Sequence, residues 1–132
     1  MRQSFSPLRQ NILDLVERSA SPLSAHDIFG SIEGNTAFST VYRALWYLEE
    51  KELIEGFFLS CAECGNERYY ISRSLGHAHF FHCEKCHSFI NIGECFFEPV
   101  KKSLEKKFRI AVKHHSFHVS GLCSSCGGKS HE

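Results

Sequence analysis

Two CxxC pairs, Cys83-Glu84-Lys85-Cys86 and Cys123-Ser124-Ser125-Cys126, lie in the second half of this 132-residue sequence. Two residues between the thiols of one pair let both sulfurs turn toward a single ion, and two pairs supply the four ligands of a tetrahedral zinc site. Four thiolates leave no open coordination position, so such an ion stabilises a fold and does not catalyse a reaction. The spacing predicts a structural Zn²⁺ site of Cys83, Cys86, Cys123 and Cys126.

The segment around these pairs is long enough for secondary structure of its own. Aromatic and branched residues predict strands over residues 77–82, 89–92 and 110–119. Glu98-Pro99 is typical of a helix start, and apolar residues at helical spacing continue that helix. The zinc ion would join the ends of this small α/β domain. We expect one helix face to point inward, namely Val100, Leu104 and Phe108.

The first half of the sequence predicts three short helices. Ser6-Pro7 is typical of an N-cap and first helical residue, and apolar spacing extends this helix to about Ser19. Ser24 with Asp27 forms a capping-box pattern for a second helix. Ser39 can cap a third helix. Its buried stripe is expected to be Val41, Leu45 and Leu48.

A predicted β-hairpin follows the three helices directly. Residues 53–59 and 68–71 are rich in aromatic and branched side chains, and a turn is expected at residues 64–66. Three helices followed by a hairpin are typical of a winged helix-turn-helix. The fold class is therefore α+β, with a winged-helix domain at residues 1–73 and a metal-binding domain at residues 74–132.

Composition indicates a soluble globular protein, with 42% hydrophobic and 23% charged residues. We find no secretion signal and no apolar stretch of membrane-spanning length, so we expect a cytoplasmic protein whose seven cysteines are reduced. The formal net charge is zero, and residues 1–55 hold five Lys and Arg against eight Asp and Glu. Any affinity for nucleic acid must then come from a few well-placed contacts.

The start of the third predicted helix carries the candidate DNA contacts. A helix N-terminus in the major groove presents its first turns to bases and phosphates, where Arg can bond guanine and Tyr can touch a thymine methyl or a phosphate. Tyrosine and arginine on a helix are also common surface residues, so the pattern gains its value from the winged-helix context. The candidates are Ser39, Thr40, Tyr42 and Arg43.

A second metal site is predicted from the histidines around the CxxC pairs. On a strand, His77 and His79 point to the same side, as two ligands of one ion require. Glu98 can add a carboxylate and His115 a third imidazole. Such nitrogen and oxygen ligands suit an exchangeable Zn²⁺, Fe²⁺, Mn²⁺ or Co²⁺. The alternative is that these histidines are solvated surface residues.

Further cysteines leave several functions open. Cys61 and Cys64 form a third CxxC pair at the predicted hairpin turn, where they can bind an ion, act as a redox pair or simply occupy the turn. Cys95 is unpaired. His26, alone on the short second helix, is interpreted as a surface residue and not as a ligand.

An ordered set of motifs resembles the ferric uptake regulator (Fur) family, which includes iron, zinc, manganese and peroxide sensors. The set runs from Pro7-Leu8-Arg9-Gln10 through Ser24-Ala25-His26-Asp27 and Thr40-Val41-Tyr42-Arg43 to Gly121-Leu122-Cys123. The resemblance implies a homodimer joined through its C-terminal domain, with two winged helices on a pseudo-palindromic operator in double-stranded DNA. It also places Tyr42 and Arg43 on the recognition helix, the two CxxC pairs at the structural zinc, and the four residues of the second site at a family metal site.

The sequence departs from the family at its principal sensing site. The positions that would supply ligands hold residues around Leu23, Tyr70, Ala78, Phe80 and Asn91, none of which is a good ligand. The site is either absent or rebuilt from neighbours. This depletion disfavours a peroxide sensor that works by histidine oxidation. The candidate neighbours are Cys61, Cys64, His82 and Cys95.

These patterns together predict a metal-dependent repressor, in which metal fixes the DNA-competent arrangement, with a hinge around Gly56. Two rival functions stay open. A metal-dependent hydrolase would also use His and Glu clusters, although the sequence contains no HExxH motif. A zinc-stapled interaction module without DNA binding is favoured mildly by the acidic first half.

Overall fold

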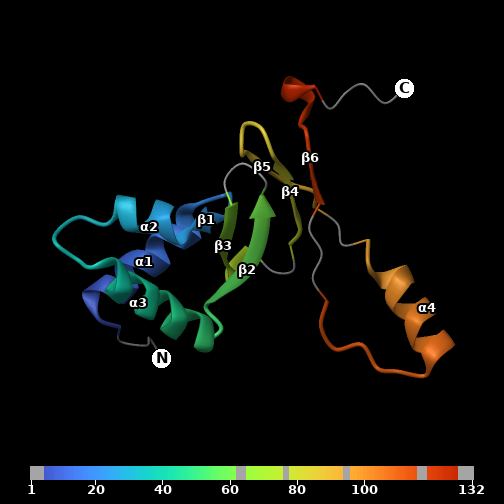
Figure 1. The fold of residues 1–132 in the computed structure, drawn as a ribbon. Helices are drawn as coiled ribbons and strands as arrows, with labels where there is room; N and C mark the ends of the chain where they lie inside the picture. The colour runs from blue at the N-terminus through green and yellow to red at the C-terminus, as the bar shows by residue number, and fades with distance from the viewer. Residues whose placement is uncertain (1–4, 62–64, 76–77, 94–95, 116–118, 128–132) are drawn as a thin grey trace. The chain divides into compact units, whose positions relative to one another are not determined.

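The computed structural model describes residues 5–61, 65–75, 78–93, 96–115 and 119–127 of the chain (Figure 1). Internal contacts divide the chain into two compact units, residues 1–76 and 77–132, and the division lies three residues beyond the predicted one at residue 73. Each unit combines helices with a three-stranded sheet, which confirms the α+β class.

Helix α1 (Pro7–Arg18) begins and ends as predicted. Ser6 is its N-cap, because the Ser6 side-chain oxygen accepts a hydrogen bond from the backbone N–H of Arg9. Pro7 occupies the first turn, where a missing N–H has no consequence for helix bonding. The apolar face is buried through Ile12, Leu13 and Val16.

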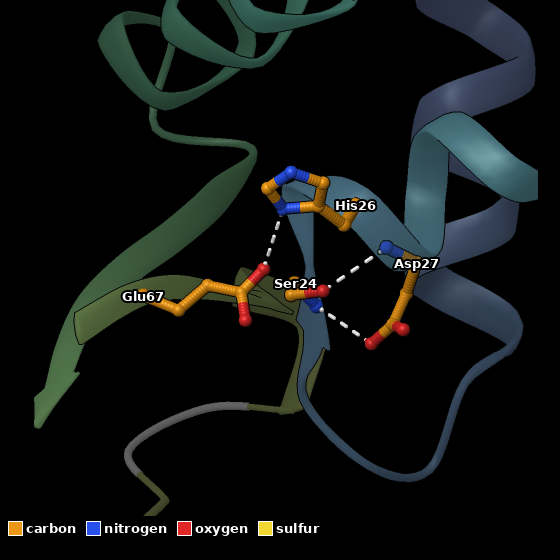
Figure 2. A network of polar contacts seen from close by, with 4 residues as sticks. All are labelled: Ser24, His26, Asp27 and Glu67. Atoms are coloured by element: carbon orange, nitrogen blue, oxygen red, sulfur yellow. Dashed lines mark hydrogen bonds and ion pairs between the residues drawn. The ribbon is translucent and has the colours of Figure 1, made fainter. Parts of the chain in front are cut away.

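The capping box predicted for the second helix is present (Figure 2). Ser24 closes the short strand β1 (Leu23–Ser24) and caps α2 (Ala25–Ser31). Its hydroxyl accepts from the Asp27 N–H at 3.0 Å, and the Asp27 carboxylate accepts from the Ser24 N–H at 3.1 Å. One serine therefore ends a strand and starts a helix.

Helix α3 (Phe38–Glu50) begins earlier than predicted, so the assignment of Ser39 as its N-cap was wrong. The cap is Ala37, and no side chain bonds the free N–H groups of the first turn. Phe38 packs on the core of the unit, with its ring 5.4 Å from that of Phe29 and 5.9 Å from that of Tyr42. This packing holds Phe38 inside the helix. The predicted buried stripe is confirmed, with one addition: Val41, Ala44, Leu45 and Leu48.

The predicted hairpin is confirmed as β2 (Ile54–Cys61) and β3 (Gly65–Ser72), which pair antiparallel in a sheet of order β1-β3-β2. The predicted turn extended too far, because Gly65 pairs with Cys61 inside the ladder. A 3-10 turn, η1 (Arg73–Leu75), follows. Ile54 of β2 and Tyr70 of β3 join the buried cluster formed by the three helices, so the hairpin shares their core.

The hinge predicted around Gly56 is not supported by its position. Gly56 lies within β2 and pairs with Tyr70. A Cβ atom at this position would overlap the Glu49 carboxylate and the Arg68 guanidinium, which form an ion pair of 2.6 Å. Glycine at this position leaves room for the Glu49–Arg68 ion pair, which a Cβ atom would displace.

The second unit contains β4 (Phe80–Cys83), β5 (Phe89–Asn91) and β6 (Val119–Gly121), in the order β5-β4-β6. β4 pairs antiparallel with β5 and parallel with β6. The predicted strands were too long: β4 begins at Phe80, and residues 110–115 are not a strand.

Helix α4 (Glu98–Phe108) occupies the predicted range, but its apolar face does not point inward. Val100 is 49% exposed and Phe108 is 58% exposed. Periodicity identifies which face of a helix is apolar and not whether the same chain covers it. A 3-10 turn, η2 (Ser124–Cys126), closes the described chain. Among the described residues, no helix has the length and apolarity needed to cross a membrane.

Candidate metal centre and nucleic-acid interface

The structure brings the four predicted zinc ligands together. The Sγ atoms of Cys83, Cys86, Cys123 and Cys126 all lie within 4.8 Å of one another. The Sγ atoms of Cys86 and Cys123 are 3.8 Å apart, which is too long for a disulfide. A tetrahedral zinc with Zn–S bonds of ~2.3 Å has sulfur–sulfur edges of about 3.8 Å. The Cys86–Cys123 edge therefore has the length expected of a tetrahedral thiolate site, and the other sulfur pairs lie within 4.8 Å.

Parallel pairing of β4 with β6 places the two CxxC pairs side by side. Cys83 pairs with Gly121, and the backbone N–H of Glu84 donates to the Gly121 carbonyl at 2.8 Å. The first CxxC pair begins at the end of β4, and the second lies on η2 directly after β6. Gly127 ends η2 with φ of 110°, a conformation that glycine adopts without strain.

Backbone hydrogen bonds prepare one sulfur of the cluster as a thiolate. The N–H groups of Cys86 and Cys123 each approach the buried Cys83 Sγ at 3.5 Å. These hydrogen bonds lower the pKa of Cys83 to about 5. Cys126 is the opposite case, because its thiol contact with Cys123, together with burial, raises its pKa to about 12. Four thiolates this close need a cation, and a soft divalent ion such as Zn²⁺ fits the donor set.

Of the second predicted metal site, the structure brings two described residues near one another, His79 and His115, but with Glu98 they do not form a cluster of three ligand atoms. The rings of His79 and His115 are 5.4 Å apart, and the ring of Phe97 stacks on His115 at 4.1 Å. His79 is buried and His115 is half-buried. Glu98 follows Phe97 at the start of α4 and is exposed. His77 lies outside the described residues.

His82 occupies a position that sequence analysis did not anticipate. It is 1% exposed, and neither of its ring nitrogens has a hydrogen-bond partner among the described residues. Its ring stacks on His87 at 5.5 Å and lies 5.0 Å from Phe89. Burial is the main cause that lowers the pKa of His82. Of the other suggested extra ligands, Cys61 ends β2, and Cys64 and Cys95 lie outside the described residues.

The candidate DNA contacts lie together on the first turns of α3. Ser39, Thr40, Tyr42 and Arg43 are all exposed, while Val41 on the opposite face is fully buried. Among the described residues, no carboxylate lies within ion-pair distance of Arg43. The helix thus presents an unpaired cation and a tyrosine beside uncapped backbone N–H groups.

A side-chain contact joins the helix-turn-helix to the wing (Figure 2). His26 Nδ1 of α2 lies 2.8 Å from the Glu67 carboxylate of β3. The His26 side chain is 75% exposed, which agrees with its interpretation as a surface residue. Its ring also lies 4.8 Å from that of Phe38 at the start of α3. Sequence reasoning missed this contact because the two partners are 41 positions apart.

Two of the positions at which the family's principal sensing site would supply ligands hold buried residues here. Tyr70 is 2% exposed and belongs to the core of the first unit. Burial raises the pKa of Tyr70, so its phenol stays protonated and is a poor ligand. Phe80 is buried in the second unit.

The profile of the Ferric uptake regulator family matches residues 3–120 of the chain. The ferric uptake regulation protein of Bacillus subtilis (strain 168) is 30% identical over 124 residues, which span 89% of this chain and 80% of that protein. The solved structure of the Helicobacter pylori ferric uptake regulator is similar with a TM-score of 0.76 at 26% identity, covering 93% of this chain and 81% of that chain. A zinc uptake regulator complexed with zinc and DNA has a TM-score of 0.62 at 22% identity, covering 93% and 83% of the two chains.

A helix-turn-helix with a β-hairpin and a unit with a four-cysteine cluster define a metal-responsive transcription regulator. The chain belongs to the Ferric uptake regulator family. The resemblance predicted from the motifs is confirmed. Members of this family regulate transcription and are not enzymes, so the hydrolase alternative is wrong.

Proposed function

We propose that this chain is a DNA-binding repressor of genes for metal uptake or homeostasis, active in the cytoplasm as a homodimer on a pseudo-palindromic operator. The observation that carries the proposal is the first part of α3, where Tyr42 and Arg43 are exposed and have no carboxylate partner within the described part of the chain. Such residues at a helix N-terminus can contact bases and phosphates in the major groove. Ser39 and Thr40 add hydroxyl donors on the same turns.

The two metal sites have different roles in this proposal. Cys83, Cys86, Cys123 and Cys126 hold a permanent zinc, because four thiolates bind it tightly and leave no open position. His77, His79, Glu98 and His115 hold an exchangeable Zn²⁺, Fe²⁺ or Mn²⁺ through nitrogen and oxygen ligands. The approach of His79 to His115 supports this second ligand set.

The exchangeable site acts as the effector site. Its ligands come from the segment before β4, the start of α4 and the stretch after α4. Bringing them to one ion fixes these segments relative to one another. If the arrangement with the ion bound favours DNA binding, occupancy raises DNA affinity, and DNA must tighten metal binding by the same factor.

The direct test is DNA affinity with and without each metal. The operator is first selected from a random duplex pool by the zinc-loaded protein. Fluorescence anisotropy then gives the dissociation constant with Zn²⁺, Fe²⁺ and Mn²⁺ and after mild chelation that leaves the thiolate zinc in place. We expect one metal to raise operator affinity by roughly 5- to 150-fold. Equal affinities under all conditions would remove the sensing role.

A variant pair separates the repressor from an interaction module without DNA binding. Tyr42→Ala/Arg43→Ala should abolish operator selectivity in a protein that still unfolds cooperatively, with a thermal unfolding midpoint lowered only by loss of the contact between the Tyr42 and Phe38 rings. Arg18→Ala is the matched control, because Arg18 is an exposed arginine at the far end of α1. If the unmodified protein selects no duplex from the pool, the interaction module becomes the better description.

A further inference from the structure

A hollow of about 320 Å³ lies between the start of α1 and the first turns of α3. It belongs entirely to the first unit and adjoins the exposed residues of the recognition helix. No acidic residue is among its lining residues, although residues 1–55 carry more Asp and Glu than Lys and Arg. The lining residues are Ser6, Leu8, Arg9, Thr40, Arg43 and Ala44.

An arginine from each of two helices is among the residues that line this hollow. Arg9 comes from α1 and Arg43 from α3. Among the described residues, neither has a carboxylate within ion-pair distance, whereas Arg68 pairs with Glu49 and Arg73 with Glu55. Two arginines that line one hollow without a carboxylate partner among the described residues favour an anion there, since each guanidinium offers several N–H donors in a plane.

The Arg9 side chain is held in place before any ligand arrives. Its guanidinium carbon lies 3.6 Å from the centre of the Tyr47 ring, a close cation–π contact. Phe5 packs edge-on against the same ring at 6.2 Å, and the Lys51 ammonium lies 5.5 Å from its centre. A guanidinium stacked by its face keeps its N–H edges free for hydrogen bonds.

Neutral groups at the hollow also favour an anion. The hydroxyls of Ser6 and Thr40 line it and can donate hydrogen bonds. The 12-residue α1 and the 13-residue α3 both begin close to it, so the positive ends of two helix dipoles add to the charge of the arginines. The chemistry of the site is that of a phosphate receptor.

We propose that this hollow binds one backbone phosphate of duplex DNA, with Arg9 as its principal donor, while Arg43 at the rim is left to contact a base. This inference rests on the proposed DNA-binding function and extends it to α1. A phosphate contact beside the recognition helix fixes the depth and register of α3 in the groove. It also supplies local positive charge that the composition of this half of the chain lacks.

The test compares Arg9→Gln with the matched control Arg18→Gln on the same helix. Dissociation constants are measured by anisotropy for the selected operator and for a random duplex over a series of salt concentrations. For Arg9→Gln we expect binding to both duplexes to weaken on the order of tenfold. The slope of log K against log salt should fall by about one, as for the loss of one phosphate contact. Arg18→Gln should match the unmodified protein.

Two further variants test the charge and the position of the Arg9 side chain. Arg9→Lys retains the charge and should restore most of the slope of log K against log salt. Tyr47→Leu should weaken binding to both duplexes, because the Arg9 guanidinium loses its contact with the Tyr47 ring. Thermal unfolding verifies that each variant is folded. If Arg9→Gln equals Arg18→Gln in affinity and slope, the phosphate site is wrong while the repressor proposal stands. If Arg9→Gln weakens only the operator, Arg9 contacts a base instead. If the unmodified protein binds neither duplex, both proposals fail.

Discussion

At the scale of single residues, the four cysteines differ in how readily they lose a proton. Cys83 accepts two backbone N–H groups and has its pKa lowered to about 5, while the pKa of Cys126 is raised to about 12 by its thiol contact with Cys123 and by burial. A divalent ion stabilises all four thiolates at once and so removes this difference. Metal binding and folding of the second unit are therefore coupled.

Replacing the central sulfur tests this coupling. Cys83→Ser removes the ligand that is fully buried and accepts both N–H groups. We expect the tightly held zinc to fall well below one per chain, measured by elemental analysis after dialysis. The unfolding midpoint should fall by roughly 10 °C or more. Ser125→Ala in the second CxxC pair is the control and should keep both values. Full zinc content in Cys83→Ser would exclude the four-thiolate site.

We expect the buried ring of His82 to make stability depend on pH. Its two ring nitrogens are buried without a hydrogen-bond partner among the described residues, and its pKa is lowered, mainly by burial. Below about pH 6.5 the unfolded chain binds a proton that the folded chain does not. Stability therefore falls as pH falls through this value. His82→Phe should flatten this slope and, by removing the unsatisfied groups, raise stability at pH 7 by about 1 kcal/mol.

Urea unfolding between pH 5 and 8 measures both effects. The quantity compared is the difference in the free energy of unfolding between His82→Phe and the unmodified protein at each pH, because acid also protonates the cysteines in both. His114→Phe, at an exposed histidine, serves as the control. If the free energy of unfolding of His82→Phe changes with pH as steeply as that of the unmodified protein, or if the variant loses bound metal, His82 has a different role, such as metal ligation.

At the scale of elements, the wing is held to the rest of its unit by the shared core and by contacts between residues far apart in the sequence. β1 pairs with β3, His26 of α2 contacts Glu67 of β3, and Glu49 of α3 pairs with Arg68. The sequence predicted the helices, the capping box and the hairpin, because these depend on neighbouring residues. It did not predict β1 or the Ala37 cap, which depend on Tyr70 and Phe38 packing against distant elements.

Two glycine substitutions should have opposite signs. At Gly56, a methyl group meets the Glu49–Arg68 ion pair and displaces it, so Gly56→Ala should cost up to about 1 kcal/mol. At Gly30 in α2, an added Cβ meets nothing within 4 Å, so Gly30→Ala should stabilise by about 0.5–1 kcal/mol. Urea unfolding measures both. In a Glu49→Gln background the effect of Gly56→Ala should shrink, and an undiminished effect would contradict this mechanism.

At the scale of the whole molecule, the sequence predicted the four-cysteine cluster, because each CxxC spacing is a local pattern that marks a pair of metal ligands. It could not predict the hollow beside Arg9, which forms only when the starts of α1 and α3 meet. It could not predict the burial of His82, where a polar residue lies between Phe81 and Cys83 in a buried strand. The prediction that the apolar face of α4 points inward was wrong in an informative way. Its apolar residues have helical spacing, but the described residues of the same chain do not bury them.

The exposed stripe of α4 supports the proposed homodimer. Val100 and Phe108 are about half exposed, and Leu104 lies between them on the same face. Exposed apolar surface of this kind on a small unit marks an interaction site. A homodimer with twofold symmetry can cover the same stripe on both subunits, and it would place two recognition helices on the two halves of a palindrome.

Phe108→Glu should therefore act on assembly and on DNA together. A buried, unpaired carboxylate in the interface is expected to raise the dimer dissociation constant at least tenfold, as measured by analytical ultracentrifugation. Operator affinity should fall in the same protein, because a single subunit loses the gain from simultaneous binding of two half-sites. Lys106→Glu makes a larger change of charge at an exposed position of α4 and should leave assembly intact. If Phe108→Glu stays dimeric at the same concentrations, the stripe is not the dimer interface, and another surface must join the two chains.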